Sequence, residues 1–361
     1  METYLRKLEH IVNIDSGSYS EKGIREVVNF IKQEFNGWDI KEKNKDSINP
    51  ILIIENKNNG PKVLLAGHLD TVFPEGTVKE RPFKIKDEIA YGAGVADMKS
   101  GILSLIKVAK DLTEEGVALR IILNTDEEIS SPYSKDHIVE ACKNTKFAYV
   151  FEPARKNGNL VVERKGISKY KVEIEGKSSH AGINPELGIS SIHNLGIWIN
   201  GLTSLIDLES GNSINIGLIN GGTGVNVVAD KAEFIFESRT MDKTFFTQVE
   251  KTLNRIKSES EKKGIKINIS QIGYRPPMKA NKKTEILKRS FLEEAERLNI
   301  KIGFESTGGG SDANFIADYG IPVIDGVGPI GGNAHSKDEY LEINSISERI
   351  ELVKNVILNL I

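Results

Sequence analysis

The sequence has a single cysteine, no long hydrophobic run and little excess of either charge. With Cys142 alone the chain cannot form an internal disulfide, which excludes a disulfide framework. No apolar segment reaches the length needed to cross a bilayer, so no transmembrane helix is expected. The net charge is −3 with both signs interspersed, which excludes the basic face that nucleic-acid binding requires. These absences predict a protein with neither a membrane nor a nucleic-acid partner.

Length and composition indicate an ordinary globular enzyme. Of the 361 residues, 39% are hydrophobic and 27% are charged, as in typical globular proteins. The chain is longer than one core usually supports, which favours two domains. Residues 1–13 are charged and amphipathic and lack the apolar core of a signal peptide. We therefore expect a cytoplasmic location.

A short polar motif, Gly67-His68-Leu69-Asp70-Thr71, follows the apolar run Val63–Ala66, which predicts a buried strand. His68 and Asp70 are two residues apart, so their side chains share one face of an extended strand. Asp70 can then hold the far ring nitrogen of His68 while the near nitrogen binds a metal. A polar strand end without a ligand is the simpler alternative, and this pair alone does not decide between them.

Acidic side chains follow other predicted elements. Asp97 lies where a helix is expected to begin, a place that favours negative charge, although a simple N-cap is an alternative. The strand Leu119–Asn124 is followed by Asp126-Glu127-Glu128, and the strand Phe147–Phe151 by Glu152. Ligands in open α/β sheets collect at the carboxyl ends of strands. Adjacent acids are costly to crowd together unless cations neutralise them, which favours a metal site over a solvated loop.

A second histidine, His335, follows a predicted strand at Ile321–Ile324 and a glycine loop. Two histidines and several acids can hold two adjacent ions if one acid bridges them. Ions about 3.5–4 Å apart can hold a hydroxide between them and clamp a carbonyl oxygen. Mixed imidazole and carboxylate ligands suit Zn²⁺, with Co²⁺ or Mn²⁺ as alternatives.

The middle of the chain has a different pattern. Four strands and two helices are expected, in the order Ile167–Glu175, Pro185–Leu205 (helix), Ser213–Ile219, Ala229–Arg239, Phe245–Lys263 (helix) and Ile265–Ile272. This β-α-β-β-α-β order is ferredoxin-like. The segment Arg275-Pro276-Pro277 looks like a linker. We therefore predict a catalytic domain in two parts, 1–166 and 276–361, with a small domain, 167–275, inserted between them.

As a set, these motifs resemble the dizinc metallopeptidase and aminoacylase family that includes glutamate carboxypeptidase, succinyl-diaminopimelate desuccinylase and aminoacylase. The resemblance is strongest to bacterial glutamate carboxypeptidase. The matching segments, in order, are residues 67–72, 92–101, 125–128, 152–153, 176–182, 221–226 and 331–339. The resemblance implies an α/β fold, in which a mixed-sheet zinc-peptidase catalytic domain carries an inserted ferredoxin-like domain for lid closure and dimerisation.

The same resemblance implies a role for each matching metal ligand. His68, Asp97 and Glu152 would hold one Zn²⁺ ion. Asp97, Glu128 and His335 would hold the second, so that Asp97 bridges the two Zn²⁺ ions of each subunit. The family also commonly has a cis peptide bond after the bridging aspartate, here between Asp97 and Met98.

Catalytic and substrate-binding roles are implied as well. Glu127 would take a proton from the metal-bound water and pass it to the leaving amine. Asp70 would orient His68, and His180 would polarise the scissile carbonyl from the same subunit or from its partner, although a structural role in a turn is an alternative for His180. Substrate contacts are implied for Asn226, Arg239 and Arg275. An arginine suits a free carboxylate because its planar fork binds both oxygens, but Arg275 could instead anchor the domain linker.

We predict a cytoplasmic dizinc amidohydrolase, a metallocarboxypeptidase that cleaves a peptide or N-acyl amino acid next to a free carboxylate. The expected assembly is a homodimer formed through the inserted domain. Alternatives on the same site are N-acyl-amino-acid deacylase, desuccinylase, dipeptidase and aminopeptidase activity. A non-catalytic binding protein with this fold is a further alternative, which the presence of Glu127 and of every ligand disfavours.

Overall fold

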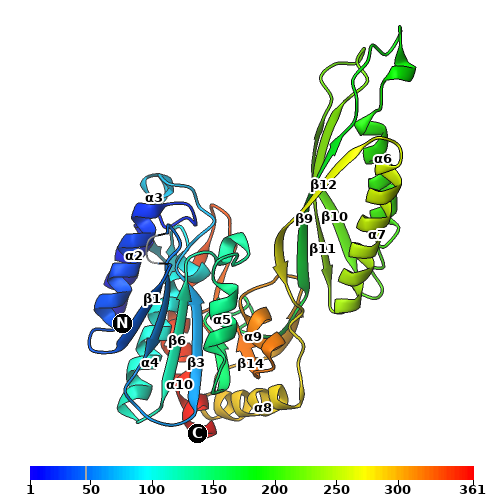
Figure 1. The fold of residues 1–361 in the computed structure, drawn as a ribbon. Coiled ribbons are helices and arrows are strands. Elements are labelled where there is room, and N and C mark those ends of the chain that lie inside the picture. Colours follow the sequence, from blue (N-terminus) through cyan, green and yellow to red (C-terminus); the bar gives the residue numbers. More distant parts are fainter. Residues whose placement is uncertain (45–46) are drawn as a thin grey trace. The chain divides into compact units, whose positions relative to one another are not determined.

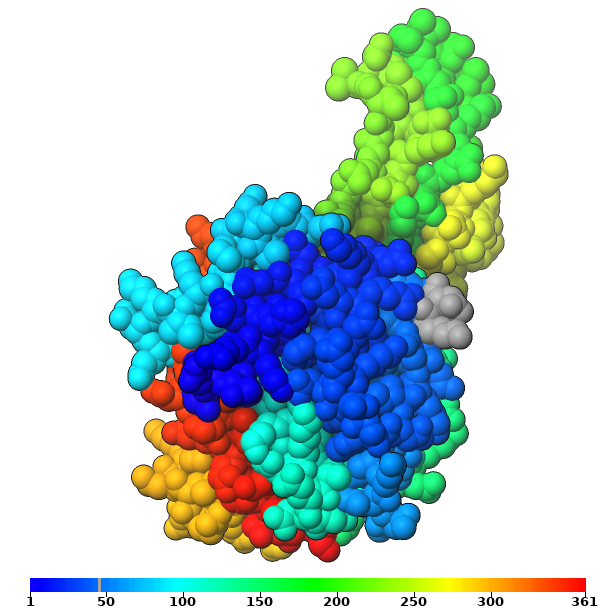
Figure 2. All heavy atoms as spheres, turned by 90° about the vertical axis from the view of Figure 1, so that its left-hand side faces the viewer, coloured from blue at the N-terminus to red at the C-terminus, as the bar shows by residue number. Residues whose placement is uncertain are grey.

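The computed structural model describes residues 1–44 and 47–361, and the chain divides into two compact units. Unit 1 comprises Met1–Arg164, Met278–Thr307 and Ser311–Ile361, and unit 2 comprises Lys165–Pro277 and Gly308–Gly310. Figure 1 shows both units coloured along the chain, and the space-filling view of Figure 2 shows N-terminal (blue) and C-terminal (red) residues of unit 1 on the same face. Within the described residues, no helix combines the length and hydrophobicity needed to span a membrane.

Unit 1 is built on a mixed sheet of eight strands in the order β1-β2-β6-β3-β7-β14-β8-β13. The strands are β1 (Asp39–Lys43), β2 (Ile51–Glu55), β3 (Lys62–His68), β6 (Leu119–Asn124), β7 (Thr145–Val150), β8 (Leu160–Arg164), β13 (Phe304–Thr307) and β14 (Val323–Asp325). The four central strands β6, β3, β7 and β14 run parallel. Parallel strands are usually covered on both faces, which explains why β3 reads as a continuous apolar run.

Two layers of helices cover this sheet. One face packs against α1 (Glu2–Val12), α2 (Glu21–Glu34), α4 (Gly101–Glu114), α8 (Lys282–Arg297) and α10 (Asn344–Leu360). The other face packs against α5 (Lys135–Ala141) and α9 (Ala313–Tyr319) (Figure 1). Successive side chains of β3 point to opposite faces of the sheet and so contribute to both helix layers. Val63 and Leu65 belong to the first core, and Leu64 and Ala66 belong to the second.

A small antiparallel sheet completes unit 1 and brings distant segments together. Its order is β15-β16-β5-β4, with β4 (Lys84–Lys86), β5 (Ile89–Tyr91), β15 (Gly331–Gly332) and β16 (Tyr340–Glu342). A short helix, α3 (Thr77–Glu80), precedes it in the chain. Because β5 pairs with β16, the turn after β5 lies beside the loop between β15 and β16. This pairing is what places Asp97 next to His335.

Unit 2 contains a four-stranded antiparallel sheet in the order β10-β11-β9-β12. Its elements follow the chain order β9 (Gly166–Glu175), α6 (Ser191–Thr203), β10 (Ser213–Gly221), β11 (Lys231–Thr240), α7 (Lys243–Glu261) and β12 (Lys266–Arg275). Both helices pack on one face of the sheet around the buried Trp198, Phe234 and Val249. The opposite face carries the polar residues that alternate with the core positions.

The expected helix over Pro185–Leu205 is wrong at its start. Residues Pro185–Leu187 form a single isolated turn, and Gly188 is extended. Helix α6 begins at Ser191 because Ser190 is its N-cap, accepting the backbone N–H of His193 at 3.1 Å. An apolar pattern that continues across Gly188 conceals this boundary.

Candidate metal centre

His68 ends β3 and is almost fully buried, with 2% of its surface exposed. Its Nδ1 lies 3.0 Å from the backbone carbonyl oxygen of Asp70 and 3.3 Å from the Oδ1 of Asp70. Two acceptors at Nδ1 place the ring proton there, which leaves Nε2 as the ligand atom. Nε2 lies 3.1 Å from Asp97 Oδ1 and 3.6 Å from Glu152 Oε1.

Asp97 sits in the irregular segment η1 (Val95–Ser100) just before α4, where its dihedrals of φ −112° and ψ 96° depart from a helix. The peptide bond between Asp97 and Met98 is cis, as the resemblance implies. The two carboxylate oxygens of Asp97 face different partners: Oδ1 faces His68, and Oδ2 lies 3.2 Å from His335 Nε2. This is the placement that a bridging carboxylate needs.

Glu128 and His335 form the other half of the cluster. Glu128 Oε2 lies 3.2 Å from His335 Nε2, the same nitrogen that faces Asp97. His335 is half exposed and has a left-handed backbone, with φ at 64°. Glu128 Oε1 is buried and has no hydrogen-bond partner among residues 1–44 and 47–361. A buried carboxylate oxygen left in this state indicates that a cation belongs beside it.

Asp70 connects the histidine strand to the acidic turn. Its carboxylate accepts a hydrogen bond from Ser18 Oγ at 2.7 Å and from the backbone N–H groups of Glu127 and Glu128, each at 3.2 Å. The same carboxylate faces His68 Nδ1. Asp70 therefore fixes two parts of the cluster at once, from a fully buried position.

Glu339 is a further functional candidate, and no role for it is implied by the sequence motifs, although it lies within the matching segment 331–339. Its buried carboxylate accepts the backbone N–H groups of Gly94, Ala96 and Asp97 at 2.9–3.0 Å. Burial raises the pKa of Glu339 to about 7 against these hydrogen bonds. It holds the turn of Asp97 against the loop of His335. The available signal was an acid four residues after a predicted histidine ligand.

The electrostatics of the metal-free cluster show a shortage of positive charge. Burial raises the pKa of Glu152, and the neighbouring Asp97 charge raises it further. Hydrogen bonds to Asp97 and Glu128 raise the pKa of His335 to about 11. Burial opposes ionisation of Asp97, but hydrogen bonds from His335 and His68 outweigh it and lower the Asp97 pKa. The surrounding carboxylates thus favour the cationic form of both histidines.

The donor geometry agrees with a pair of ions. Two atoms that bind one tetrahedral zinc ion at about 2.0–2.1 Å lie roughly 3.3 Å apart. The facing donor atoms of His68, Asp97 and Glu152 are separated by 3.1 and 3.6 Å, and those of Asp97, Glu128 and His335 by 3.2 Å. The atoms of His68, Asp97 and Glu128 also form a compact group in which all lie within 4.8 Å of one another. The residues present therefore fit metal ions.

The predicted general base, Glu127, lies in the short turn η2 (Glu127–Ile129) after β6. It is close enough to Glu152 for its charge to contribute to the raised Glu152 pKa. Its neighbour Asp126 is directed elsewhere, since Asp126 Oδ2 accepts the backbone N–H groups of Tyr133 and Ser134. Asp126 therefore shapes the turn, while Glu127 lies near the cluster.

The remaining predicted residues, His180, Asn226, Arg239 and Arg275, belong to unit 2. His180 is exposed, and its Nδ1 accepts the backbone N–H groups of Gly182 and Ile183 at 3.1 Å. Its neighbour Ala181 donates its backbone N–H to the carbonyl of Asn226 at 2.9 Å. Arg239 is held by Glu237 and by the carbonyl of Gly308, each at 2.7 Å, and Arg275 is buried at the end of β12.

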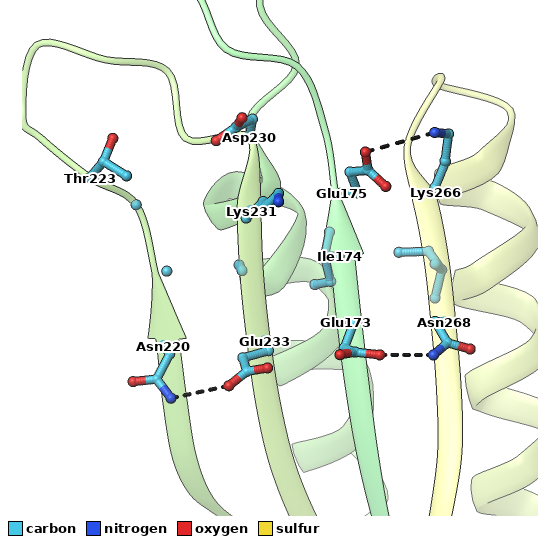
Figure 3. A pocket seen from close by; sticks show the side chains of 14 residues that line it. Glu173, Ile174, Glu175, Asn220, Thr223, Asp230, Lys231, Glu233, Lys266 and Asn268 are labelled. Carbon is cyan, nitrogen blue, oxygen red and sulfur yellow. Dashed lines mark hydrogen bonds and ion pairs between the residues drawn. The ribbon is translucent and has the colours of Figure 1, made fainter.

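A hollow of about 680 Å³ on the open sheet face of unit 2 has a different chemistry (Figure 3). Several of its polar groups pair across the strands, with Asn268 donating to Glu173 at 2.8 Å and Lys266 lying 3.7 Å from Glu175. Its lining in the described part of the chain contains no histidine or cysteine. This hollow is a solvated sheet face rather than a metal centre.

Comparison with known proteins gives matches along nearly the whole chain. The sequence model of Peptidase family M20/M25/M40 matches residues 64–359. Carboxypeptidase G2 of Pseudomonas sp. (strain RS-16) is 28% identical, covering 99% of this chain and 89% of the relative. Succinyl-diaminopimelate desuccinylase of Sulfurimonas denitrificans is 24% identical, with coverages of 92% and 93%. An M20 family metallo-carboxypeptidase from Sulfolobus solfataricus has a similar fold, with a TM-score of 0.80, 17% identity and coverages of 99% and 98%.

Proposed function

The chain belongs to peptidase family M20/M25/M40, and from this we propose that it cleaves the amide bond of a peptide or N-acyl amino acid next to a free carboxylate. Family membership makes it a metal-dependent hydrolase and agrees with the resemblance found in the motifs. The observation that carries the proposal is the position of Asp97, whose two oxygens each face a different histidine. The 28% identity to carboxypeptidase G2 favours the carboxypeptidase reaction.

We assign the ligands in two sets that share Asp97. His68 and Glu152 complete one set, and Glu128 and His335 complete the other. Zn²⁺ is the proposed metal because imidazole and carboxylate ligands suit it, with Co²⁺ and Mn²⁺ as alternatives. When bound, such a pair of ions polarises a carbonyl oxygen and lowers the pKa of water.

Glu127 is the proposed proton carrier. The Asp70 carboxylate accepts the backbone N–H groups of both Glu127 and Glu128, and we assign different roles to these two neighbouring side chains. Glu127 accepts a proton from the attacking water and donates it to the leaving amine, so that one carboxylate serves both steps. Asp70 orients His68 and keeps the acidic turn in place.

His180 is the proposed polarising group of unit 2. Since its Nδ1 accepts two backbone N–H groups, the neutral ring carries its proton on Nε2. An Nε2–H can donate to the oxygen on which negative charge develops during attack. The ring is supplied by the same subunit or by its partner. Asn226 and Arg239 are proposed to contact the substrate, and Arg275 is proposed to bind its free carboxylate.

Unit 2 is the proposed ferredoxin-like lid and dimerisation domain. Strand β10 lies at the edge of its sheet, and residues 217–221 of this strand are exposed on both faces. Leu218 and Ile219 are among these residues, and an exposed apolar edge strand is a site for pairing with another chain. Light scattering should give the mass of a homodimer, and Leu218→Lys should shift it towards the monomer.

The reaction can be tested with matched substrates. We would compare an N-acyl amino acid, its C-terminal amide, and a dipeptide with a free or a blocked amine, each with added Zn²⁺ and with a chelator. The proposal predicts chelator-sensitive cleavage that tolerates a blocked amine and is lost when the carboxylate is amidated. Cleavage only of substrates with a free amine would support a dipeptidase or aminopeptidase instead. A cytoplasmic location remains a prediction.

A further inference from the structure

A second hollow, of about 410 Å³, lies in unit 1 directly beside the metal ligand Glu128. Three short stretches line it: residues 17–20, 71–75 and 128–129. The first two stretches are held together by the backbone, since the Thr71 N–H donates to the Ser16 carbonyl at 2.9 Å. A side chain at Gly17 would meet the Phe73 carbonyl at 2.3 Å, so glycine allows this close approach. The walls of the hollow are therefore fixed by the fold.

Large apolar side chains border this hollow. Tyr19 is 76% exposed and Val72 is 41% exposed, while Phe73 and Ile129 are partly buried. Scattered exposed apolar residues are normal, but these converge on one concavity that adjoins the proposed ligand cluster. Concave sites lined by apolar and aromatic side chains are typical of small-molecule subsites.

The charges around the hollow disfavour binding of the carboxylate half of the substrate there. Its charged lining residues are Glu75 and Glu128, and no lysine, arginine or histidine lines it within the described chain. Glu128 is assigned to the metal, so Glu75 is the charge left facing an occupant. A free carboxylate in this hollow would face the negative charge of Glu75, which is unfavourable. The lining therefore offers the carboxylate half of the substrate no side-chain cation to pair with, which favours binding of that half elsewhere.

We infer that this hollow is the subsite for the acyl side of the scissile bond, and that it takes an uncharged apolar group, including an aromatic one. The inference rests on the proposed function and narrows it. The volume of the hollow, about 410 Å³, lies in the range of small-molecule sites, about 300–1,000 Å³. An apolar subsite favours N-aroyl over N-succinyl amino acids as substrates. The inference therefore distinguishes an enzyme that prefers N-aroyl substrates from a desuccinylase.

The test compares three substrates that share one amino acid and differ in an acetyl, benzoyl or succinyl group. The wild-type kcat/KM should be at least about tenfold higher for benzoyl than for succinyl, a ratio equivalent to about 1.4 kcal/mol. Tyr19→Ala should reduce the benzoyl-to-acetyl ratio of kcat/KM several-fold. Val72→Lys should lower the benzoyl-to-succinyl ratio at least about tenfold by adding a cation. Tyr319→Ala removes another exposed tyrosine outside the hollow and should leave all ratios unchanged.

The outcomes separate the two proposals. If the acetyl substrate is cleaved with metal but neither substitution changes the ratios, the subsite assignment is wrong and the proposed function stands. A wild-type preference for succinyl would overturn the assignment in the same way. If no N-acyl substrate is cleaved in the presence of metal while free-amine dipeptides are, the proposed function fails and the subsite falls with it.

Discussion

Acidic residues are crowded in two places in this protein, at the strand ends of unit 1 and on the open sheet face of unit 2. On the sheet face, Glu173 and Glu233 each lie 2.9 Å from Lys171 and are exposed to water. A hydrogen bond from Asn268, together with Lys171, lowers the pKa of Glu173, and Lys171 lowers that of Glu233. At the strand ends, burial raises the pKa of Glu128 and Glu152.

The opposite directions of these pKa shifts distinguish a solvated acidic surface from a buried cluster of metal ligands. A solvated surface neutralises its own acids with neighbouring lysines and amides, and so needs no ligand (Figure 3). The buried cluster has two histidines as its closest partners, and it keeps a carboxylate oxygen without a partner in the described residues. The number of acidic residues alone would make the two regions equal candidates for metal binding. The burial of the carboxylates and the partners that neutralise them distinguish the two regions.

The largest effect should come from removing the carboxylate shared by both ligand sets. Asp97→Ala should lose the bound metal and more than about a thousandfold in activity, since losing several kcal/mol of transition-state stabilisation costs tenfold per 1.4 kcal/mol. Metal analysis after dialysis and kcat measurements check this. The matched variant Glu173→Ala removes an acid from the sheet face and should keep both metal and activity.

Glu127→Gln should give the next largest effect and separate chemistry from metal binding. The amide keeps the size of the side chain but cannot carry the proton, so kcat should fall by about 10²–10⁴-fold. Metal content should stay at the wild-type value. Normal turnover in Glu127→Gln would show that another group is the base, and loss of metal would show that Glu127 is a ligand.

Metal affinity should depend strongly on pH. The pKa of His335, raised to about 11 in the metal-free protein by Asp97 and Glu128, keeps its ring protonated at neutral pH. A metal must displace this proton, so binding strengthens as pH rises towards 11, by about tenfold per pH unit for each proton released. Competition with a chelator at pH 6, 7 and 8 measures this slope. A flat profile would mean that His335 does not bind the ion.

Glu339 should act on metal affinity through the turn that it holds. Glu339→Ala should weaken metal binding by about 10–100-fold, as is usual for groups that orient ligands. Glu339→Gln retains one acceptor oxygen and should recover part of the lost metal affinity. A measurement of unfolding alone would not distinguish this effect from a general loss of stability. Asp338→Ala, at the exposed neighbouring acid, is the control and should bind metal normally.

The smallest effect should come from the sheet face. Lys171→Ala removes an exposed ion pair partner of Glu173 and Glu233 and should leave the urea unfolding curve almost unchanged, because surface ion pairs contribute little. Metal affinity and kcat should be unaffected. A large loss of bound metal in Lys171→Ala would contradict the claim that only the acidic cluster of unit 1 binds metal.

Local patterns were sufficient for much of the fold. The run Val63–Ala66 predicted β3, and its alternation explains how one strand feeds two cores. The start of α6 was missed because the apolar pattern continues past Gly188, whereas Ser190 decides where the helix begins. Caps of this kind depend on one hydrogen bond, and sequence periodicity does not register them.

The candidate site was predictable in type but not in arrangement. Strand ends indicated which residues collect at one edge of the sheet, and the motif resemblance supplied their grouping. The approach of Asp97 to His335 depends on the pairing of β5 with β16, which joins segments about 250 residues apart and leaves no local signal. The three backbone contacts of Glu339 arise from the same pairing, which is why its role emerged only in three dimensions.

The central claim is that Asp97 holds two ions side by side. Its most direct test is to load the metal-free protein with Mn²⁺, count the bound ions, and record the electron paramagnetic resonance spectrum. The account predicts two ions per chain with the spin coupling of a bridged pair, and loss of that coupling in Asp97→Ala. One ion per chain, or two ions without coupling, would contradict it.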